Sequence, residues 1–164
     1  MVQALKIVIE KYPNTKVYQV GENQESRDEA GRNFEALLDF YGIKENFILY
    51  GRRKEPLREL DLPTSIYINS SLQEGQCIAV YDAALLGNAL CLPKISSFIG
   101  VLDGNTRLHA VGDHEKLAEN IIYYTEHKEE REESIRKNRD WIADHYNFPF
   151  IQKRIQEEFD LLHL

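Results

Sequence analysis

The sequence has no long apolar run, no regular cysteine pattern and no excess of basic residues. No stretch approaches the roughly 18 apolar residues of a membrane-spanning helix, and Lys6 and Glu10 interrupt the short apolar run at the start, which excludes a signal peptide. Cys77 and Cys91 lack metal-ligand spacing, so we expect reduced thiols in a cytoplasmic protein. The formal net charge of -7 argues against a nucleic-acid-binding surface, which needs a basic stripe.

Two common kinds of site also leave no trace in the sequence. The segment 21–23, which follows the first predicted strand, lacks the three-glycine fingerprint of dinucleotide-binding proteins, and this argues against NAD. The 5 histidines show no metal-ligand spacing, and no Asp-x-Asp pair follows a strand near the candidate site. We therefore expect neither a metal nor another cofactor.

Short apolar runs alternate with longer amphipathic segments along the whole chain of 164 residues. The pattern predicts strands at 16–20, 46–50, 65–69, 89–93 and 106–111. Helices are predicted over 25–41 and 77–86, with a turn or short helix at 56–60 and a helical remainder from 114. Such alternation predicts an α/β fold of the Rossmann-like kind, a three-layer arrangement with a parallel sheet between two layers of helices. No linker or repeat interrupts it, so we expect one domain over 1–164.

The first predicted element is a helix that ends before Tyr12-Pro13, because proline disfavours the helical conformation in the residue before it. A doubly wound domain ordinarily opens on a strand. We therefore expect these residues to be a fragment of a longer protein, with the first strand of the domain outside them.

The segment 70–87 carries the clearest functional signal. Glu74-Gly75 stands at the predicted opening of a helix, and Asp82 follows eight residues after Glu74. A helix start offers unpaired backbone N–H groups and a positive dipole end, which suit a diphosphate. A carboxylate beside an anion cannot bind that anion, so it is better suited to accept hydrogen bonds from hydroxyl groups. A ligand with a central anion and hydroxyl groups on both sides of it matches a nucleotide-sugar.

Structural explanations of the same residues remain open. Ser71 and Glu74 have the spacing of a capping box, which needs no ligand. Gly75 would then fall in the first turn, where glycine costs about 1 kcal/mol relative to alanine. Asp82 could be an ordinary surface acid. Cys77 stands where a helix start would lower its pKa, but no histidine is near it in sequence and apolar residues follow, so we expect no nucleophile there.

With these residues, the sequence resembles the C-terminal, donor-binding domain of retaining GT-B glycosyltransferases. More narrowly, it resembles family four, the group 1 transferases. The resemblance covers nearly the whole chain. Its most specific part is a glutamate-glycine pair followed by an acid-alanine pair and a glycine. The matching residues are Tyr12-Pro13, Val20-Gly21, Tyr50-Gly51, Ser70, Ser71, Glu74-Gly75, Asp82-Ala83 and Gly87.

The resemblance implies a nucleotide-sugar donor, no metal, and retaining transfer of a hexosyl group. It implies that Glu74 is the catalytic-site residue contacting hydroxyls of the donor sugar, and that Asp82 holds the ribose. Asp82 departs from the family's usual glutamate, and its carboxylate sits about 1.5 Å further back because one methylene is missing. The other donor-binding residues that the resemblance implies are Gly51, Arg52, Gly75, Gln76, Cys77 and Ile78.

The resemblance also implies a partner domain. The acceptor-binding N-terminal domain and the basic residues that neutralise the diphosphate lie outside these residues, so we expect the isolated domain to be inactive in transfer. The full-length protein is expected to be cytoplasmic, either free or peripheral to the inner face of a membrane. Two alternatives stay open: a non-catalytic interaction module with a decayed site, and a nucleotide-sugar epimerase of the same architecture.

Overall fold

Five short strands alternate with helices in the computed structural model, which describes residues 1–20, 29–51, 53, 65–75, 77–100, 102, 105–146 and 148–161. The strands are β1 (Val17–Gln19), β2 (Phe47–Leu49), β3 (Ile66–Ile68), β4 (Ala89–Pro93) and β5 (Arg107–His109). The helices are α1 (Val2–Lys11), α2 (Glu29–Phe40), α4 (Ile78–Leu85), α5 (His114–Glu126), α6 (Lys128–His145) and α7 (Phe148–Leu161), with a 3-10 turn η1 (Lys44–Asn46). The predicted strands are confirmed. The first residues of the predicted helix, 25–28, and the predicted turn at 56–60 lie outside the described residues.

The strands form two parallel sheets where the sequence predicts one. β1 pairs with β2, and β4 lies between β3 and β5. No ladder joins β1 to β3 among the described residues. The predicted α/β architecture is nevertheless present, with strands in the middle and helices on both faces.

β4 is the centre of the fold because each of its side chains is buried. Leu90 and Leu92 pack with α4 and α6 residues in one core, whereas Ala89 and Cys91 face the core formed with α1 and α5. This is the period-2 alternation expected of a strand with helices on both sides. Burial raises the pKa of the Cys91 thiol to about 12, so this cysteine is an inert core residue.

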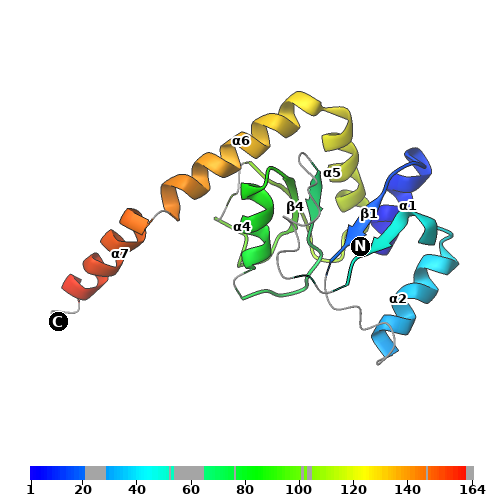
Figure 1. Ribbon diagram of the computed structural model, residues 1–164, viewed down its shortest axis with the longest axis horizontal. Coiled ribbons are helices and arrows are strands. Elements are labelled where there is room, and N and C mark those ends of the chain that lie inside the picture. Colours follow the sequence, from blue (N-terminus) through cyan, green and yellow to red (C-terminus); the bar gives the residue numbers. More distant parts are fainter. Residues whose placement is uncertain are drawn as a thin grey trace.

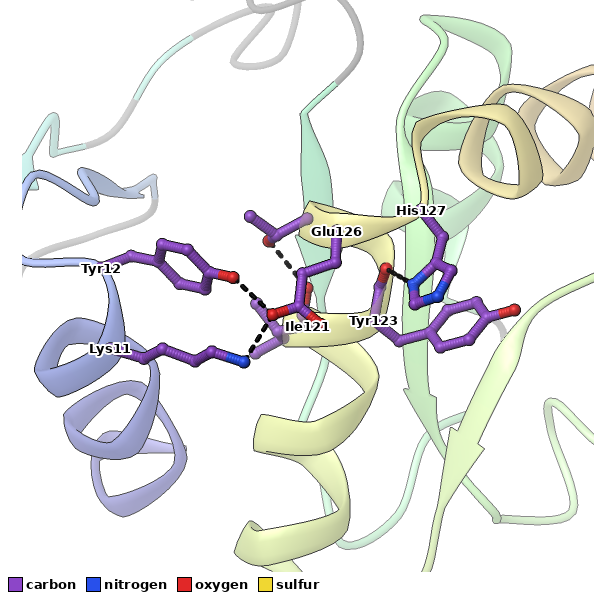
Figure 2. A network of polar contacts seen from close by, with 7 residues as sticks. Lys11, Tyr12, Ile121, Tyr123, Glu126 and His127 are labelled. Carbon is purple, nitrogen blue, oxygen red and sulfur yellow. Dashed lines mark hydrogen bonds and ion pairs between the residues drawn. The ribbon is translucent and has the colours of Figure 1, made fainter.

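The end of α1 is fixed to the end of α5 by one carboxylate. Glu126 Oε1 accepts hydrogen bonds from Lys11 Nζ at 2.5 Å and from the Tyr12 hydroxyl at 2.7 Å (Figure 2). α5 follows β5 and packs along it, so it runs from the carboxyl end of β5 back toward the end where the strands begin. β1, which comes directly after α1, therefore starts at the same edge as β3, β4 and β5.

The last two helices differ, because α6 contributes Ile135 and Ile142 to the two cores whereas α7 packs on α6. α6 crosses the fold and packs on α4, where Arg139 Nε donates to the carbonyl of Leu85 at 3.0 Å, and α7 extends beyond it (Figure 1). α4 ends as predicted at Gly87, whose φ of +87° lies in the left-handed region that favours glycine. None of the helices in the described part of the chain is long and apolar enough to cross a membrane.

Candidate functional site

The candidate site begins where β3 ends, at Asn69. The backbone N–H of Asn69 still donates to Cys91 of β4, but its buried side chain organises the next turn. Its Oδ1 accepts from the Ser71 N–H at 2.8 Å, and its Nδ2 lies 3.4 Å from Glu74 Oε1 and 3.7 Å from Cys77 Sγ. An asparagine that bonds the backbone two residues on is typical of a turn. Asn69 thus connects the strand end to the whole loop before α4.

Glu74 is held by this loop at a defined position. Its Oε1 accepts from the Ser71 hydroxyl at 2.6 Å, and its backbone carbonyl accepts from the Ser97 hydroxyl in the turn after β4. The side chain is half-buried, and within the described residues Oε2 has no hydrogen-bond partner. One carboxylate oxygen is therefore fixed by the protein while the other is available to a hydroxyl donor.

The structure excludes the capping-box interpretation of Ser71 and Glu74. α4 begins at Ile78, with Cys77 at its N-cap position, so the Ser71–Glu74 pair belongs to the loop and not to the helix. The helix predicted over 77–86 is observed at Ile78–Leu85, and Glu74-Gly75 lies just before it in the strand-to-helix turn that Asn69 organises. Cys77 provides no side-chain hydrogen bond to the first turn, and this leaves helix N–H groups without a side-chain cap.

Gly75 is not explained by the fold. It is exposed, its φ is outside the left-handed region, and a Cβ built on it would meet no atom within 4 Å. Neither backbone conformation nor packing therefore requires a glycine at this position. A glycine at this position leaves the backbone open to close approach from outside the protein.

Replacing Gly75 with alanine is expected to leave stability unchanged or slightly raised, since the added methyl meets open space. Binding of a ligand that approaches this backbone is expected to weaken by about tenfold, because the methyl removes room for close contact. Thermal unfolding and calorimetric titration would measure the two effects. A loss of stability with unchanged binding would show that Gly75 serves the fold.

Cys77 and Ile78 follow at the start of α4. Burial, followed by the negative charge of Glu74, raises the pKa of the Cys77 thiol. A thiol in this state is not an activated nucleophile, in agreement with the expectation from sequence. Ile78 is 64% exposed at the first helical position. Gln76 lies outside the described residues.

Asp82 lies one turn after Ile78 on the exposed face of α4. Its carboxylate makes no hydrogen bond or ion pair with any described residue. The helix thus brings Asp82 to the same solvent-facing side as its own first residue. An exposed acid without an intramolecular partner remains free to accept hydrogen bonds from a ligand.

Gly51 follows β2, in the other sheet. Its φ of +64° is a left-handed conformation that favours glycine and turns the chain at the strand end. The guanidinium of exposed Arg53 lies 5.4 Å from the ring centroid of Tyr50. Arg52 lies outside the described residues. Gly51 and Glu74 follow strands of different sheets, β2 and β3.

The sequence does not single out His109, because its histidines show no metal-ligand spacing. His109 ends β5, is 4% exposed, and its Nδ1 has no hydrogen-bond partner in the described structure. Burial, and next the positive charge of the chain's amino group, lowers the pKa of His109. The sequence feature that could have indicated a buried histidine is the place of His109 next to Leu108 in a predicted strand. No group of three or more potential metal ligands occurs in the described part of the chain.

Comparison with known proteins assigns the chain to a family. The family model described as Glycosyl transferases group 1 matches residues 1–127. The fold is that of the Rossmann-like C-terminal domain of GT-B enzymes. The chain belongs to the group 1 glycosyltransferases. No curated protein sequence matches it significantly.

Three solved structures illustrate the likeness. WaaG, a glycosyltransferase involved in lipopolysaccharide biosynthesis, has a TM-score of 0.73 at 22% identity, over 87% of this chain and 38% of its own. The C-terminal domain of LpcC from Francisella tularensis has a TM-score of 0.76 at 16% identity, over 90% of this chain and 77% of its own. Anabaena HepE, in complex with UDP and glucose, has a TM-score of 0.79 at 15% identity, over 94% of this chain and 44% of its own. The chain thus spans less than half of WaaG and of HepE.

Proposed function

We propose that this chain is the donor-binding domain of a retaining glycosyltransferase of family four. It binds a nucleoside-diphosphate sugar and presents the hexosyl group to an acceptor held by a separate N-terminal domain. The observation that carries the proposal is the loop 69–77, in which Asn69 and Ser71 hold the Glu74 carboxylate beside Gly75, a glycine for which the fold has no use.

Each part of the loop and helix has a distinct task. Glu74 accepts hydrogen bonds from hydroxyls of the donor sugar through its available oxygen. The backbone N–H groups of residues 75–78 and the start of α4 face the diphosphate, because a helix N-terminus attracts an anion. Asp82 accepts from the ribose hydroxyls. Gly51 and Arg52 contact the base from the neighbouring sheet.

This arrangement would stabilise the diphosphate as it leaves the donor sugar. As the glycosidic bond to the diphosphate breaks, the sugar acquires oxocarbenium character and the leaving oxygen acquires negative charge. Preoriented N–H groups stabilise charge that develops in the transition state without a reorganisation cost. Glu74 keeps the sugar ring in position during this step. Transfer requires both domains, so the isolated chain binds donor without turning it over.

The complex of Anabaena HepE with UDP and glucose supports UDP as the first ligand to test. Calorimetric titration of UDP into the wild-type chain is expected to give saturable binding. Asp82→Ala is expected to weaken UDP binding by about tenfold, because a hydrogen bond to a charged group contributes about 1.5 kcal/mol or more.

Asp140→Ala provides a matched control, since Asp140 is also an exposed helical aspartate, 64% exposed and paired with Arg136 on α6. It is expected to bind UDP as the wild type does. Equal affinity of Asp82→Ala and wild type would indicate a decayed or unrelated site. Failure of the folded chain to bind any nucleoside diphosphate or its sugar would refute the donor-site proposal.

A further inference from the structure

A cavity of about 200 Å³ opens at the edge of the sheet opposite to the donor-binding loop. β3, β4 and β5 are parallel, so the loop after β3 lies at their carboxyl ends, whereas this cavity lies where β5 begins. Its volume corresponds to roughly seven water molecules. The segment before β5, the end of α5 and the first half of α6 provide its walls, which include Thr106, Arg107, Tyr123, Glu130, Ser134 and Lys137.

Arg107 is held in one position in this wall. Its Nε donates to Asn120 Oδ1 at 3.2 Å, and its guanidinium carbon lies 3.7 Å from the ring centroid of Tyr123. His127 stacks on the same ring, with centroids 4.0 Å apart (Figure 2), and at these distances the two groups must cover opposite faces of Tyr123. Within the described residues, the Nη groups of Arg107 have no hydrogen-bond partner. Fixed donors are therefore available at the cavity.

The floor of the cavity is polar, uncharged and tightly bonded. The carbonyl of Asn105 accepts from the Ser134 hydroxyl and lies 3.4 Å from Asn138 Nδ2, and the hydroxyls of Tyr124 and Ser134 are 2.9 Å apart. Asn138 is fully buried beside this floor, and its Oδ1 has no partner in the described structure. A rigid polar surface of this kind fixes the position of a ligand placed on it.

The charges around the cavity exclude an ionic ligand of either sign. Lys137 Nζ is paired with Glu133 at 2.7 Å, whereas exposed Glu130 has no partner among the described residues. An anion would meet the carboxylates of Glu130 and Glu133, and a cation would meet Arg107 and Lys137. The arrangement suits a neutral ligand that both accepts and donates hydrogen bonds, and a hydroxyl group does both.

We infer that this cavity binds a neutral sugar unit, at a site separate from the donor site. Neighbouring hydroxyls of one sugar ring accept from the Arg107 Nη groups and donate to the Glu130 carboxylate. Hydrogen bonds with ionised partners are stronger than those between neutral groups, and this favours the pairing. The inference is independent of the proposed function, because no residue of the loop 69–77 or of α4 lines the cavity.

NMR titration of the 164-residue chain with glucose and with maltotriose tests this site. Saturable shifts are expected at the amides of Tyr123 and Ser134, with a Kd for glucose of about 1–10 mM, as for a ligand of about twelve non-hydrogen atoms. The amide of Gly75 reports on the donor-binding loop and is expected to stay unchanged. Tighter binding of maltotriose would identify a glycan chain as the source of the sugar unit, and equal or weaker binding a free monosaccharide.

Glu130→Ala is expected to weaken glucose binding by about tenfold, because it removes a charged acceptor. The melting temperature is expected to stay unchanged, since Glu130 has no intramolecular partner within the described residues. Glu129→Ala is the matched control, because Glu129 is the neighbouring exposed glutamate of α6 and does not line the cavity. This control is expected to bind glucose as the wild type does.

Three results would overturn the inference. The first is the absence of saturable shifts at Tyr123 and Ser134 with both sugars, including shifts confined to Gly75. The second is equal glucose affinity of Glu130→Ala and the wild type. The third is tighter binding of inorganic phosphate or of glycine than of glucose at the same amides, which would indicate a site for an anion or a zwitterion.

Discussion

Glu74→Ala is expected to weaken the binding of a UDP-sugar by about 100-fold. In the proposed function the substitution removes the acceptor for the sugar hydroxyls, and a hydrogen bond to a charged group contributes about 1.5–3 kcal/mol. It also releases the Ser71 hydroxyl and the Asn69 amide from Glu74 Oε1, so the loop loses its internal anchor. Calorimetric titration with UDP-glucose and with UDP would measure the effect separately for sugar and nucleotide.

The contrast between the two ligands is the informative result. UDP lacks the sugar, so its affinity is expected to fall much less than that of UDP-glucose. Ser97→Ala is a suitable control, because among the described residues the Ser97 hydroxyl bonds the backbone carbonyl of Glu74 and not its carboxylate. Equal losses for UDP and UDP-glucose in Glu74→Ala would show that Glu74 maintains the loop and does not contact the sugar.

Leu92→Ala is expected to lower the free energy of unfolding by about 3 kcal/mol. Leu92 is fully buried in the central strand and packs in the core that holds α4 on the sheet. Truncation loses transfer free energy and leaves a cavity that β4, paired on both sides, cannot collapse to fill. The melting temperature is expected to fall by about 6–12 °C for a chain of this size.

Chemical denaturation and calorimetry would measure the Leu92→Ala effect. Leu85→Ala is the matched control, because Leu85 lies on α4 but is 49% exposed. Leu85→Ala is expected to lower the free energy of unfolding by less than about 1 kcal/mol, because the Leu85 side chain is only partly buried. A cost in Leu92→Ala no larger than that in Leu85→Ala would contradict the central role of β4.

Much of the fold follows from local patterns in the sequence. The apolar run at 89–93 predicts a strand, and the structure has a strand there with each side chain buried. The glycine at 87 predicts a helix end, and its φ is positive. These predictions succeed because they depend on periodicity and on one residue's conformational freedom. The division of the sheet could not be predicted in this way, because pairing between β1 and β3 depends on segments distant in sequence.

The candidate site was predicted in composition and only partly in geometry. Ser71 and Glu74 have the spacing of a helix cap, and the same spacing also allows a side-chain bond within a loop. Asn69 decides between them, since its side chain extends the turn and delays the helix to Ile78. Its role comes from burial next to β4, which sequence spacing does not encode. The same holds for His109, whose missing partner is visible only in three dimensions.

The shared apolar core also affects how the molecule unfolds. No ladder joins the described strands of the two sheets, but Val17 of β1 and Phe47 of β2 pack on the same buried cluster as Ile66 and Ile68 of β3. The cooperativity of unfolding between the two sheets therefore depends on side-chain packing and not on a shared hydrogen-bond ladder. A core substitution that loosens this packing is expected to let β1 and β2 open while β3, β4 and β5 stay paired.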